Sequence, residues 1–204
     1  MRSVCILNYG SGNVKSVYNL FTAIESNVVI SNDAQVIADA THLVLPGVGA
    51  FGAAMRKIHG SLPLDVLGQR VLADRKPFLG ICVGMQVLAT RGLEFEEHEG
   101  LGWVSGTVEK LRCEDMPLPH IGWNNATVRR DSPLLAGLSE EPDFYFVHSY
   151  AVQLVNPDYC LATTRYGEEF CSILQHENLY GVQFHPEKSQ RAGLRLAKNF
   201  LSIK

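Results

Sequence analysis

The sequence is short of the features that mark disulfide-rich, zinc-binding, nucleic-acid-binding and membrane proteins. Its five cysteines are an odd number with no C-x-x-C pair, and they stand at positions 5, 82, 113, 160 and 171. This usage argues against a disulfide framework or a zinc site, so we expect no metal and a reducing, cytoplasmic setting. The net charge of −3 offers no basic field for nucleic acid. No apolar run approaches membrane-spanning length, and the first residues are too polar for a signal peptide.

The chain is long enough and apolar enough to bury a substantial core. It has 204 residues, of which 46% are hydrophobic and 19% charged, and we expect residues 1–204 to form a single domain. Apolar runs such as 4–7 and 43–45 alternate with helical patterns, as expected of parallel strands buried on both faces. From Gly102 onward, glycine-spaced β-rich segments predict antiparallel or mixed strands. The sequence therefore predicts an α/β fold with a mostly parallel sheet and antiparallel strands added in the C-terminal half.

A lone cysteine stands where a short apolar run meets a helical pattern. Residues 77–82 predict a strand, and Gly80 and Gly84 flank Cys82, where a sharp strand-to-helix turn leaves least room for side chains. The spacing G-x-C-x-G is the thiol counterpart of the G-x-S-x-G nucleophile elbow. The helix, expected to continue through Thr90, would aim its N-terminus at the sulfur and favour the thiolate. The alternative is a buried, inert cysteine beside a glycine-rich turn.

A second polar motif follows a strand-like run far downstream. Residues 179–184 predict a strand that leads into His185-Pro186-Glu187. A thiolate nucleophile needs a base, and the base needs an acceptor that orients it. His185 and Glu187 can fill these roles, so the two motifs together predict a triad, although a polar loop is the alternative for the second motif alone. His148, in the predicted strand 144–150, is another candidate base, but a histidine held in the core is the commoner interpretation.

Two glycine-containing loops follow predicted strands. The first, residues 10–12, fails the dinucleotide-binding fingerprint because its third glycine would fall at Lys15, so we expect a tight turn rather than a phosphate site. The second contains Gly47 and Gly49, which let the backbone approach a ligand closely or reorient its amides. In a cysteine hydrolase such amides would form an oxyanion hole, with the Val83 amide as the second donor. An ordinary loop is the alternative.

These motifs together resemble the class I (triad) glutamine amidotransferases. The resemblance implies a flavodoxin-like, three-layer fold and no cofactor. In that family the cysteine attacks the side-chain amide of glutamine, the histidine protonates the leaving ammonia, the glutamate orients the histidine, and water releases glutamate from the thioester. By that resemblance glutamine is the substrate, and the catalytic residues are Cys82, His185 and Glu187.

Five spaced blocks are similar to the branch of this family that serves histidine biosynthesis. They cover essentially the whole chain and occur in the expected order, at residues 9–13, 46–51, 119–124, 145–150 and 185–189. That similarity implies a heterodimer with a (β/α)8-barrel cyclase, which uses the ammonia to form imidazole glycerol phosphate and an aminoimidazole carboxamide ribotide. One departure is Asn8, where the family often has Asp; it lies away from the expected triad.

By family analogy, the remaining site residues fall into three groups. The oxyanion hole would use Gly47, Val48 and Val83. Glutamine would be held by Gly49, Gln86, Glu94, Ser149 and Tyr150. The cyclase barrel would face Asn13, Trp123, Tyr145 and Lys188.

Three other functions stay open. The chain could be an amidotransferase subunit of another pathway, although residues 122–124 and 186–189 argue against that. It could be a stand-alone peptidase that acts on γ-glutamyl peptides without a partner. It could also be a non-catalytic binding module on the same fold, with Cys82 as a structural residue.

Overall fold

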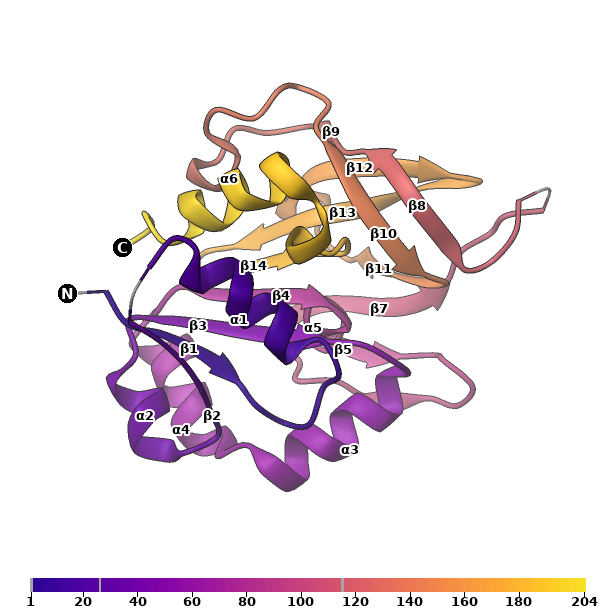
Figure 1. The fold of residues 1–204 in the computed structure, drawn as a ribbon. Helices are drawn as coiled ribbons and strands as arrows, with labels where there is room; N and C mark the ends of the chain where they lie inside the picture. Colours follow the sequence, from indigo (N-terminus) through magenta and orange to yellow (C-terminus); the bar gives the residue numbers. More distant parts are fainter. Residues whose placement is uncertain (1, 26, 115) are drawn as a thin grey trace.

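The computed structural model describes residues 2–25, 27–114 and 116–204 and has a central eight-stranded sheet of order β2-β1-β3-β4-β14-β13-β12-β9 (Figure 1). The first five strands of that order pair in parallel: β2 (Val28–Ser31), β1 (Val4–Leu7), β3 (His42–Gly47), β4 (Phe78–Cys82) and β14 (Leu179–Val182). The last three are antiparallel to their neighbours: β13 (Glu168–His176), β12 (Cys160–Tyr166) and β9 (Thr127–Val128). The predicted α/β fold, with antiparallel strands added in the C-terminal half, is confirmed.

Helices cover both faces of the parallel part of the sheet and complete three layers (Figure 1). On one face lie α1 (Val14–Thr22) and α6 (Gln190–Phe200). On the other lie α2 (Ala34–Asp39), α3 (Phe51–Ser61) and α4 (Leu64–Gly68), which continues as a π-helix, Gln69–Ala73. Because both faces are covered, β1, β3 and β4 are buried along their whole length, as the apolar runs in their sequences predict.

The helix after Cys82 is much shorter than expected. α5 covers only Val83–Gln86, and the chain then forms β5 (Ala89–Gly92), so the predicted continuation of the helix through Thr90 is wrong. β5 pairs with two strands from farther along the chain, β6 (His98–Glu99) and β7 (Val104–Lys110). Distant segments thus supply the hydrogen-bond partners of β5, and such non-local pairing overrides a weak local helical preference.

The expected strand over residues 144–150 is two strands that belong to different sheets. β10 (Asp143–His148) pairs antiparallel with β8 (His120–Asn125), whereas β11 (Tyr150–Leu154) pairs with β7. The chain changes sheets at Ser149. This break lies at the cysteine, since the Cys82 sulfur is 3.9 Å from the carbonyl oxygen of Val147.

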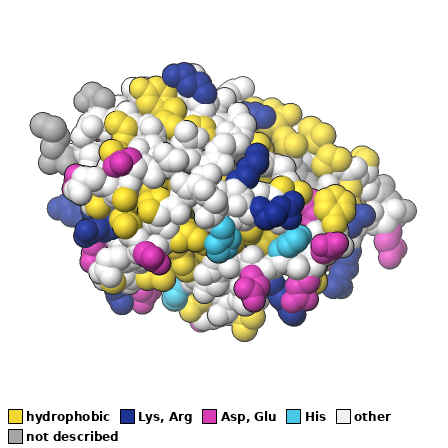
Figure 2. Space-filling model, turned by 90° about the horizontal axis from the view of Figure 1, so that it is seen from below, with side chains coloured by type: hydrophobic (Ala, Val, Ile, Leu, Met, Phe, Trp, Pro, Cys, Tyr) yellow, Lys and Arg dark blue, Asp and Glu magenta, His cyan; other side chains and the backbone are white. Residues whose placement is uncertain are grey.

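The surface carries charges of both signs. On the face in Figure 2, Lys and Arg side chains are interspersed with Asp and Glu. Mixed charge of this kind produces no single-sign field on that face. Within the described residues, no helix has the length and apolar character that crossing a membrane requires.

Candidate active site

Cys82 lies at the end of β4 in a backbone conformation that few residues adopt. Its φ is +55° and its ψ is −113°, which is unfavourable for a residue with a Cβ atom. The glycines on either side make the turn possible. A Cβ on Gly80 would overlap the Gly84 carbonyl group, and a Cβ on Gly84 would overlap the Leu45 carbonyl group. The strand-to-helix elbow predicted from G-x-C-x-G is therefore present, and it holds a thiol that is almost fully buried.

His185 and Glu187 lie beside this sulfur, on the turn that follows β14. The Nδ1 atom of His185 is 2.9 Å from the Oε1 atom of Glu187, and both side chains are buried. The imidazole and the Cys82 sulfur line the same cavity and interact electrostatically. The structure therefore brings the three predicted residues together as thiol, imidazole and carboxylate in one series.

The partners of His185 decide its charge. Burial disfavours a charged imidazole, but hydrogen bonds to Cys82 and Glu187, together with their negative charge, outweigh burial and raise the pKa of His185 to about 10. Burial likewise opposes the Glu187 carboxylate, yet the hydrogen bond and positive charge of His185 hold the pKa of Glu187 below its usual value. At neutral pH His185 thus carries a proton that it can transfer.

Asn13 supports the carboxylate of Glu187. Its Nδ2 atom donates to Glu187 Oε1 over 3.1 Å, and the Ser11 hydroxyl donates to its Oδ1 atom over 2.9 Å. The family resemblance assigns Asn13 to the partner face, but the side chain sits within the hydrogen-bond network of the triad and the residue is only 8% exposed. The tight turn at residues 10–12 therefore brings a buried amide to the triad.

A cavity of about 270 Å³ opens in front of the sulfur and the imidazole. Its lining includes every residue that the resemblance assigns to glutamine: Gly49, Gln86, Glu94, Ser149 and Tyr150. Glu94 reaches the cavity from the loop after β5, and its Oε2 atom accepts from the Phe51 amide at the start of α3 over 2.7 Å. The cavity therefore brings the nucleophile together with side chains that come from both halves of the chain.

The loop after β3 lies against the elbow. Gly47 pairs with Cys82 in the sheet, and a Cβ on Gly47 would come within 2.5 Å of the Gly84 amide nitrogen. Gly49 has a φ of +94°, and Val48 between the two glycines is partly exposed at the cavity. Val83 begins α5, where backbone N–H groups have no acceptor within the helix. All the residues assigned to the oxyanion hole thus lie beside the sulfur.

The other three residues assigned to the partner face form one patch. The rings of Trp123 and Tyr145 are T-shaped with centroids 5.9 Å apart, and the Lys188 ammonium lies 5.7 Å from the Tyr145 centroid. Trp123 is exposed, and Lys188 also lines the cavity. An exposed aromatic and basic patch of this composition is typical of a protein interface.

Sequence reasoning missed two buried polar side chains next to the sulfur. Gln183 is fully buried, and its Nε2 atom donates to the Cys82 sulfur over 3.7 Å. The Tyr9 hydroxyl lies beside Gly47, and burial together with negative charge at Cys82 raises the pKa of Tyr9 to about 12. A glutamine inside an otherwise apolar strand-like run is a signal that could have identified Gln183.

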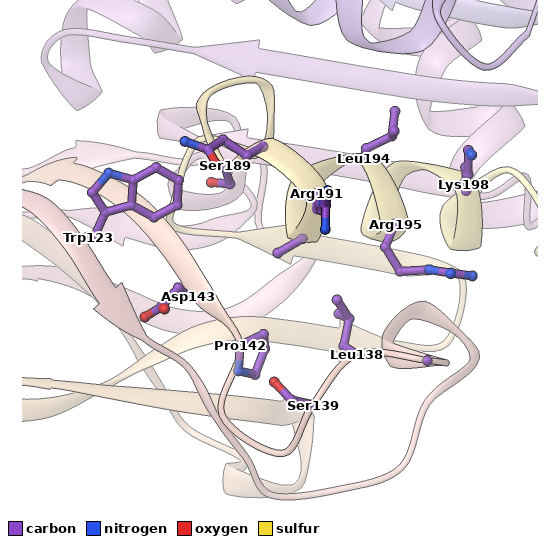
Figure 3. Close-up of a pocket in the computed structure, with 13 residues that line it drawn as sticks. Trp123, Leu138, Ser139, Pro142, Asp143, Ser189, Arg191, Leu194, Arg195 and Lys198 are labelled. Atoms are coloured by element: carbon purple, nitrogen blue, oxygen red, sulfur yellow. The ribbon is translucent and has the colours of Figure 1, made fainter.

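A larger groove runs along α6 (Figure 3). Its volume is about 700 Å³, and α6 contributes three basic side chains to it: Arg191, Arg195 and Lys198. Leu194 of the same helix is also part of its lining. The lining does not include Cys82 or His185, so the smaller cavity is the candidate active site.

Comparison with known proteins agrees with this geometry. The family model described as glutamine amidotransferase class-I matches residues 5–203. Imidazole glycerol phosphate synthase subunit HisH from Rhodospirillum rubrum is 42% identical over 208 residues, which cover 97% of each chain. The HisH subunits from Salinibacter ruber and Aquifex aeolicus are 46% and 45% identical; the matches cover 97% and 98% of this chain and 93% and 96% of theirs.

A solved structure described as a glutamine amidotransferase superimposes with a TM-score of 0.75 at 17% identity, covering 98% of this chain and 99% of that one. At this identity the similarity shows the fold alone, and the identity to the HisH subunits over nearly the full length shows the family. The chain therefore belongs to the class I glutamine amidotransferases and, within them, to the HisH subunits of imidazole glycerol phosphate synthase.

Proposed function

We propose that residues 1–204 form one cytoplasmic amidotransferase domain that hydrolyses glutamine to glutamate and ammonia for a cyclase subunit in histidine biosynthesis. The observation that carries the proposal is the placement of Cys82 and His185 on the wall of one cavity, with His185 hydrogen-bonded to Glu187. The HisH relatives support the choice of acceptor, because their names give the synthase of which they are subunits. The reaction proposed for these residues needs no cofactor.

The cavity offers hydrogen-bond acceptors to a bound glutamine. The amide nitrogen of Gln86 already donates to the Tyr150 carbonyl over 2.8 Å and to Gln183 Oε1 over 3.0 Å. Gln86 can therefore offer a ligand only its oxygen. Together with the Glu94 carboxylate, this oxygen suits the α-ammonium group of glutamine, while Gly49, Ser149 and Tyr150 complete the wall.

The catalytic series then performs acyl transfer. The Cys82 sulfur attacks the amide carbon of glutamine and forms a tetrahedral intermediate. His185 gives its proton to the amide nitrogen, which leaves as ammonia, and the acyl group remains on the sulfur as a thioester. His185 next takes a proton from water, whose oxygen attacks the thioester and releases glutamate. Glu187 holds the imidazole in the orientation that both steps need.

Backbone amides stabilise the oxyanion of the intermediate. The Val83 amide is one donor, and the amide of Val48 in the 47–49 loop is the other. A loop with glycines on both sides of Val48 can turn its amide toward or away from the sulfur. Because loss of one such donor costs about 10²–10³ in rate, the loop can keep glutamine hydrolysis slow until the partner binds its substrate.

The partner in this proposal is a (β/α)8-barrel cyclase that docks on the patch of Trp123, Tyr145 and Lys188 to form a heterodimer. Ammonia in neutral water is mostly ammonium, which is no nucleophile, so a water-excluding path into the barrel keeps it reactive. The acceptor chemistry yields imidazole glycerol phosphate and an aminoimidazole carboxamide ribotide.

Measurement of ammonia and glutamate release from glutamine, with and without the substrate-loaded cyclase, tests the proposal. We expect activity in the loaded complex, much less in the isolated chain, and none above background with Cys82→Ala. Mass spectrometry after treatment with a glutamine-like electrophile should show label on Cys82. An unlabelled cysteine would support a non-catalytic module, activity on γ-glutamyl peptides without a partner would support a peptidase, and capture of an unrelated synthase would support another pathway.

A further inference from the structure

A continuous chain of hydrogen bonds joins strand β8 to the sulfur of Cys82. In order, it passes through Asn124, His120, His148, the Tyr150 carbonyl, Gln86, Gln183 and Cys82. The six links measure 3.2, 3.0, 2.9, 2.8, 3.0 and 3.7 Å in that order. The two histidines and the two glutamines are all buried, and the links His120–His148, Gln86–Gln183 and Gln183–Cys82 form away from competing water.

Two backbone carbonyl oxygens, which can only accept hydrogen bonds, determine which atoms donate in the part of the chain that contains His120 and His148. The Tyr150 carbonyl faces Nδ1 of His148, so that nitrogen carries the proton and Nε2 is an acceptor. The Arg165 carbonyl faces Nδ2 of Asn124, so Asn124 donates to Nε2 of His120. His120 in turn donates from Nδ1 to Nε2 of His148. Both rings therefore carry their proton on Nδ1.

A backbone carbonyl also determines which atoms donate in the part of the chain that contains Gln86 and Gln183. The Tyr150 carbonyl also faces the amide nitrogen of Gln86, and that nitrogen can only donate. The atom of Gln183 that meets the second Gln86 hydrogen is therefore its oxygen, Oε1. This leaves the amide nitrogen of Gln183 pointing at the Cys82 sulfur. If the Gln183 amide turned over, its NH₂ group would face the Gln86 N–H group from which Oε1 now accepts.

The two histidines of the chain are neutral. A second proton, on Nε2, would point at the Asn124 N–H group in the case of His120 and at the His120 N–H group in the case of His148. Burial lowers the pKa of His120 to about 4 and that of His148 to about 3. The rings of Phe146 and Tyr166 stack on His120, with centroids 4.9 and 4.0 Å away, and they keep water from it. The chain is therefore a fixed, uncharged scaffold beside the charged triad.

Two groups beside the sulfur favour different protonation states of Cys82. The Val147 carbonyl oxygen, 3.9 Å from the Cys82 sulfur, can only accept, so it favours the protonated thiol. The Gln183 N–H group donates to the sulfur and interacts most strongly with the thiolate. Gln183 is thus the neutral side chain that favours the form of Cys82 that attacks glutamine.

We propose that Gln183 is a positioning residue for the glutaminase reaction, whose N–H group holds the Cys82 sulfur in its attacking form and is oriented, through Gln86, by the Tyr150 carbonyl that His148 also binds. The proposal rests on the proposed function. The Tyr150 carbonyl and Gln86 fix which atom of Gln183 faces the nucleophile, and the two histidines of the chain that starts at β8 contribute a buried N–H donor to that carbonyl.

The variant Gln183→Glu tests this because a carboxylate of the same size cannot donate to the sulfur and repels a thiolate. In the complex with loaded cyclase, we expect kcat for glutamine hydrolysis to fall about 10- to 100-fold. KM should stay within about twofold, because Gln183 does not line the glutamine cavity. In alkylation of Cys82 by iodoacetamide, the acid limb of the pH–rate profile should move up by about one pH unit or more.

Gln175→Glu is the matched control, since it makes the same change at the other end of the β13–β14 hairpin, where Gln175 bonds Ser132 and Tyr180. We expect it to leave kcat and the alkylation profile unchanged. A folded Gln183→Glu variant with native kcat and a native alkylation profile would overturn the proposal. Native protein without any glutaminase activity would instead overturn the proposed function.

Nitrogen-15 NMR of labelled histidine in the full native chain gives a second measurement that needs no variant. We expect His120 and His148 to be neutral at neutral pH, each with its proton on Nδ1. Asn124→Asp, which places an acceptor opposite Nε2 of His120, should move the His120 proton to Nε2 or charge the ring. A native chain in which either ring is charged, or carries its proton on Nε2, would overturn the oriented chain.

Discussion

Two buried pairs beside the same cavity use histidine in opposite ways. His185, which pairs with Glu187, has a pKa raised to about 10, whereas His120 and His148, which pair with each other, have pKa values of about 4 and 3. The three histidines are similarly buried, with exposed fractions of 2%, 2% and 6% for His185, His120 and His148. The depth of burial therefore does not explain the difference.

The partner of each imidazole decides the outcome. Burial penalises a charged ring in both pairs, but a carboxylate and a sulfur repay that cost for His185. The other pair meets a carbonyl oxygen, an amide N–H and a second ring, and none of these offers a negative charge. One pair can therefore transfer protons, while the other keeps fixed donor and acceptor directions.

The largest effect is expected from a substitution that removes the negative charge from the charged pair, His185 and Glu187. Glu187→Gln keeps an acceptor for His185 but removes the negative charge, so the pKa of His185 should fall and kcat for glutamine hydrolysis should drop about 10²- to 10⁴-fold. Ammonia release by the loaded complex measures kcat. Glu169→Gln, which removes an exposed partner of Arg129, is the control and should leave kcat unchanged. A loss of less than about tenfold at Glu187 would contradict the role of its charge.

The neutral pair, His120 and His148, should make the folded chain less stable in acid. The folded pKa values of His120 and His148 lie below the value of about 6.5 in an unfolded chain, so the unfolded chain binds protons first as the pH falls. Their stabilisation is complete above about pH 6.5 and is lost as the pH falls toward the folded values. For His148 the free energy of unfolding should drop by about 2 kcal/mol at about pH 5.

Urea unfolding at neutral and acid pH measures this change. His148→Gln should flatten the dependence on pH, while His59→Asn at an exposed position should not. An identical dependence in native protein and His148→Gln would count against the neutral pair. His185 has the opposite sign: its raised pKa adds stability below about pH 6.5, and that stability is lost as the pH rises through about 10.

A smaller effect is expected from the second donor to the carboxylate. Asn13→Ala removes the N–H group that supports Glu187, and we expect kcat to fall about tenfold with KM unchanged. Asn19→Ala, on the exposed side of α1, is the matched control. A rise in KM with kcat unchanged would show that Asn13 acts on substrate binding rather than on the triad.

The smallest effect concerns the ring that covers the neutral pair. Tyr166→Leu removes the ring that stacks on His120, and it should lower the free energy of unfolding by about 1 kcal/mol. Because hydrogen bonds rather than stacking set the direction of the chain, kcat should stay within about twofold of native. Tyr166→Phe keeps the ring and loses only the bond to the Pro117 carbonyl, so it serves as the control. A kcat loss as large as that of Asn13→Ala would contradict this assignment.

The charged pair could be predicted from sequence because its parts are local. Gly80 and Gly84 bracket Cys82, and His185 and Glu187 are separated by a single proline, so short motifs contain the chemistry. The neutral pair could not be predicted in this way. His120 and His148 meet only because β8 pairs with β10, and residues 144–150 show no sign of the break at Ser149 that places Tyr150 beside Gln86.

The sequence by itself determined the parallel core, the elbow and the three side chains of the proposed triad, because apolar periodicity and glycine spacing act over a few residues. Only the tertiary structure decided how far α5 extends, why Asn13 is buried, and which atom of Gln183 faces the sulfur. These features depend on hydrogen bonds between distant segments, and the direction of such bonds follows from backbone carbonyls that the fold brings into place.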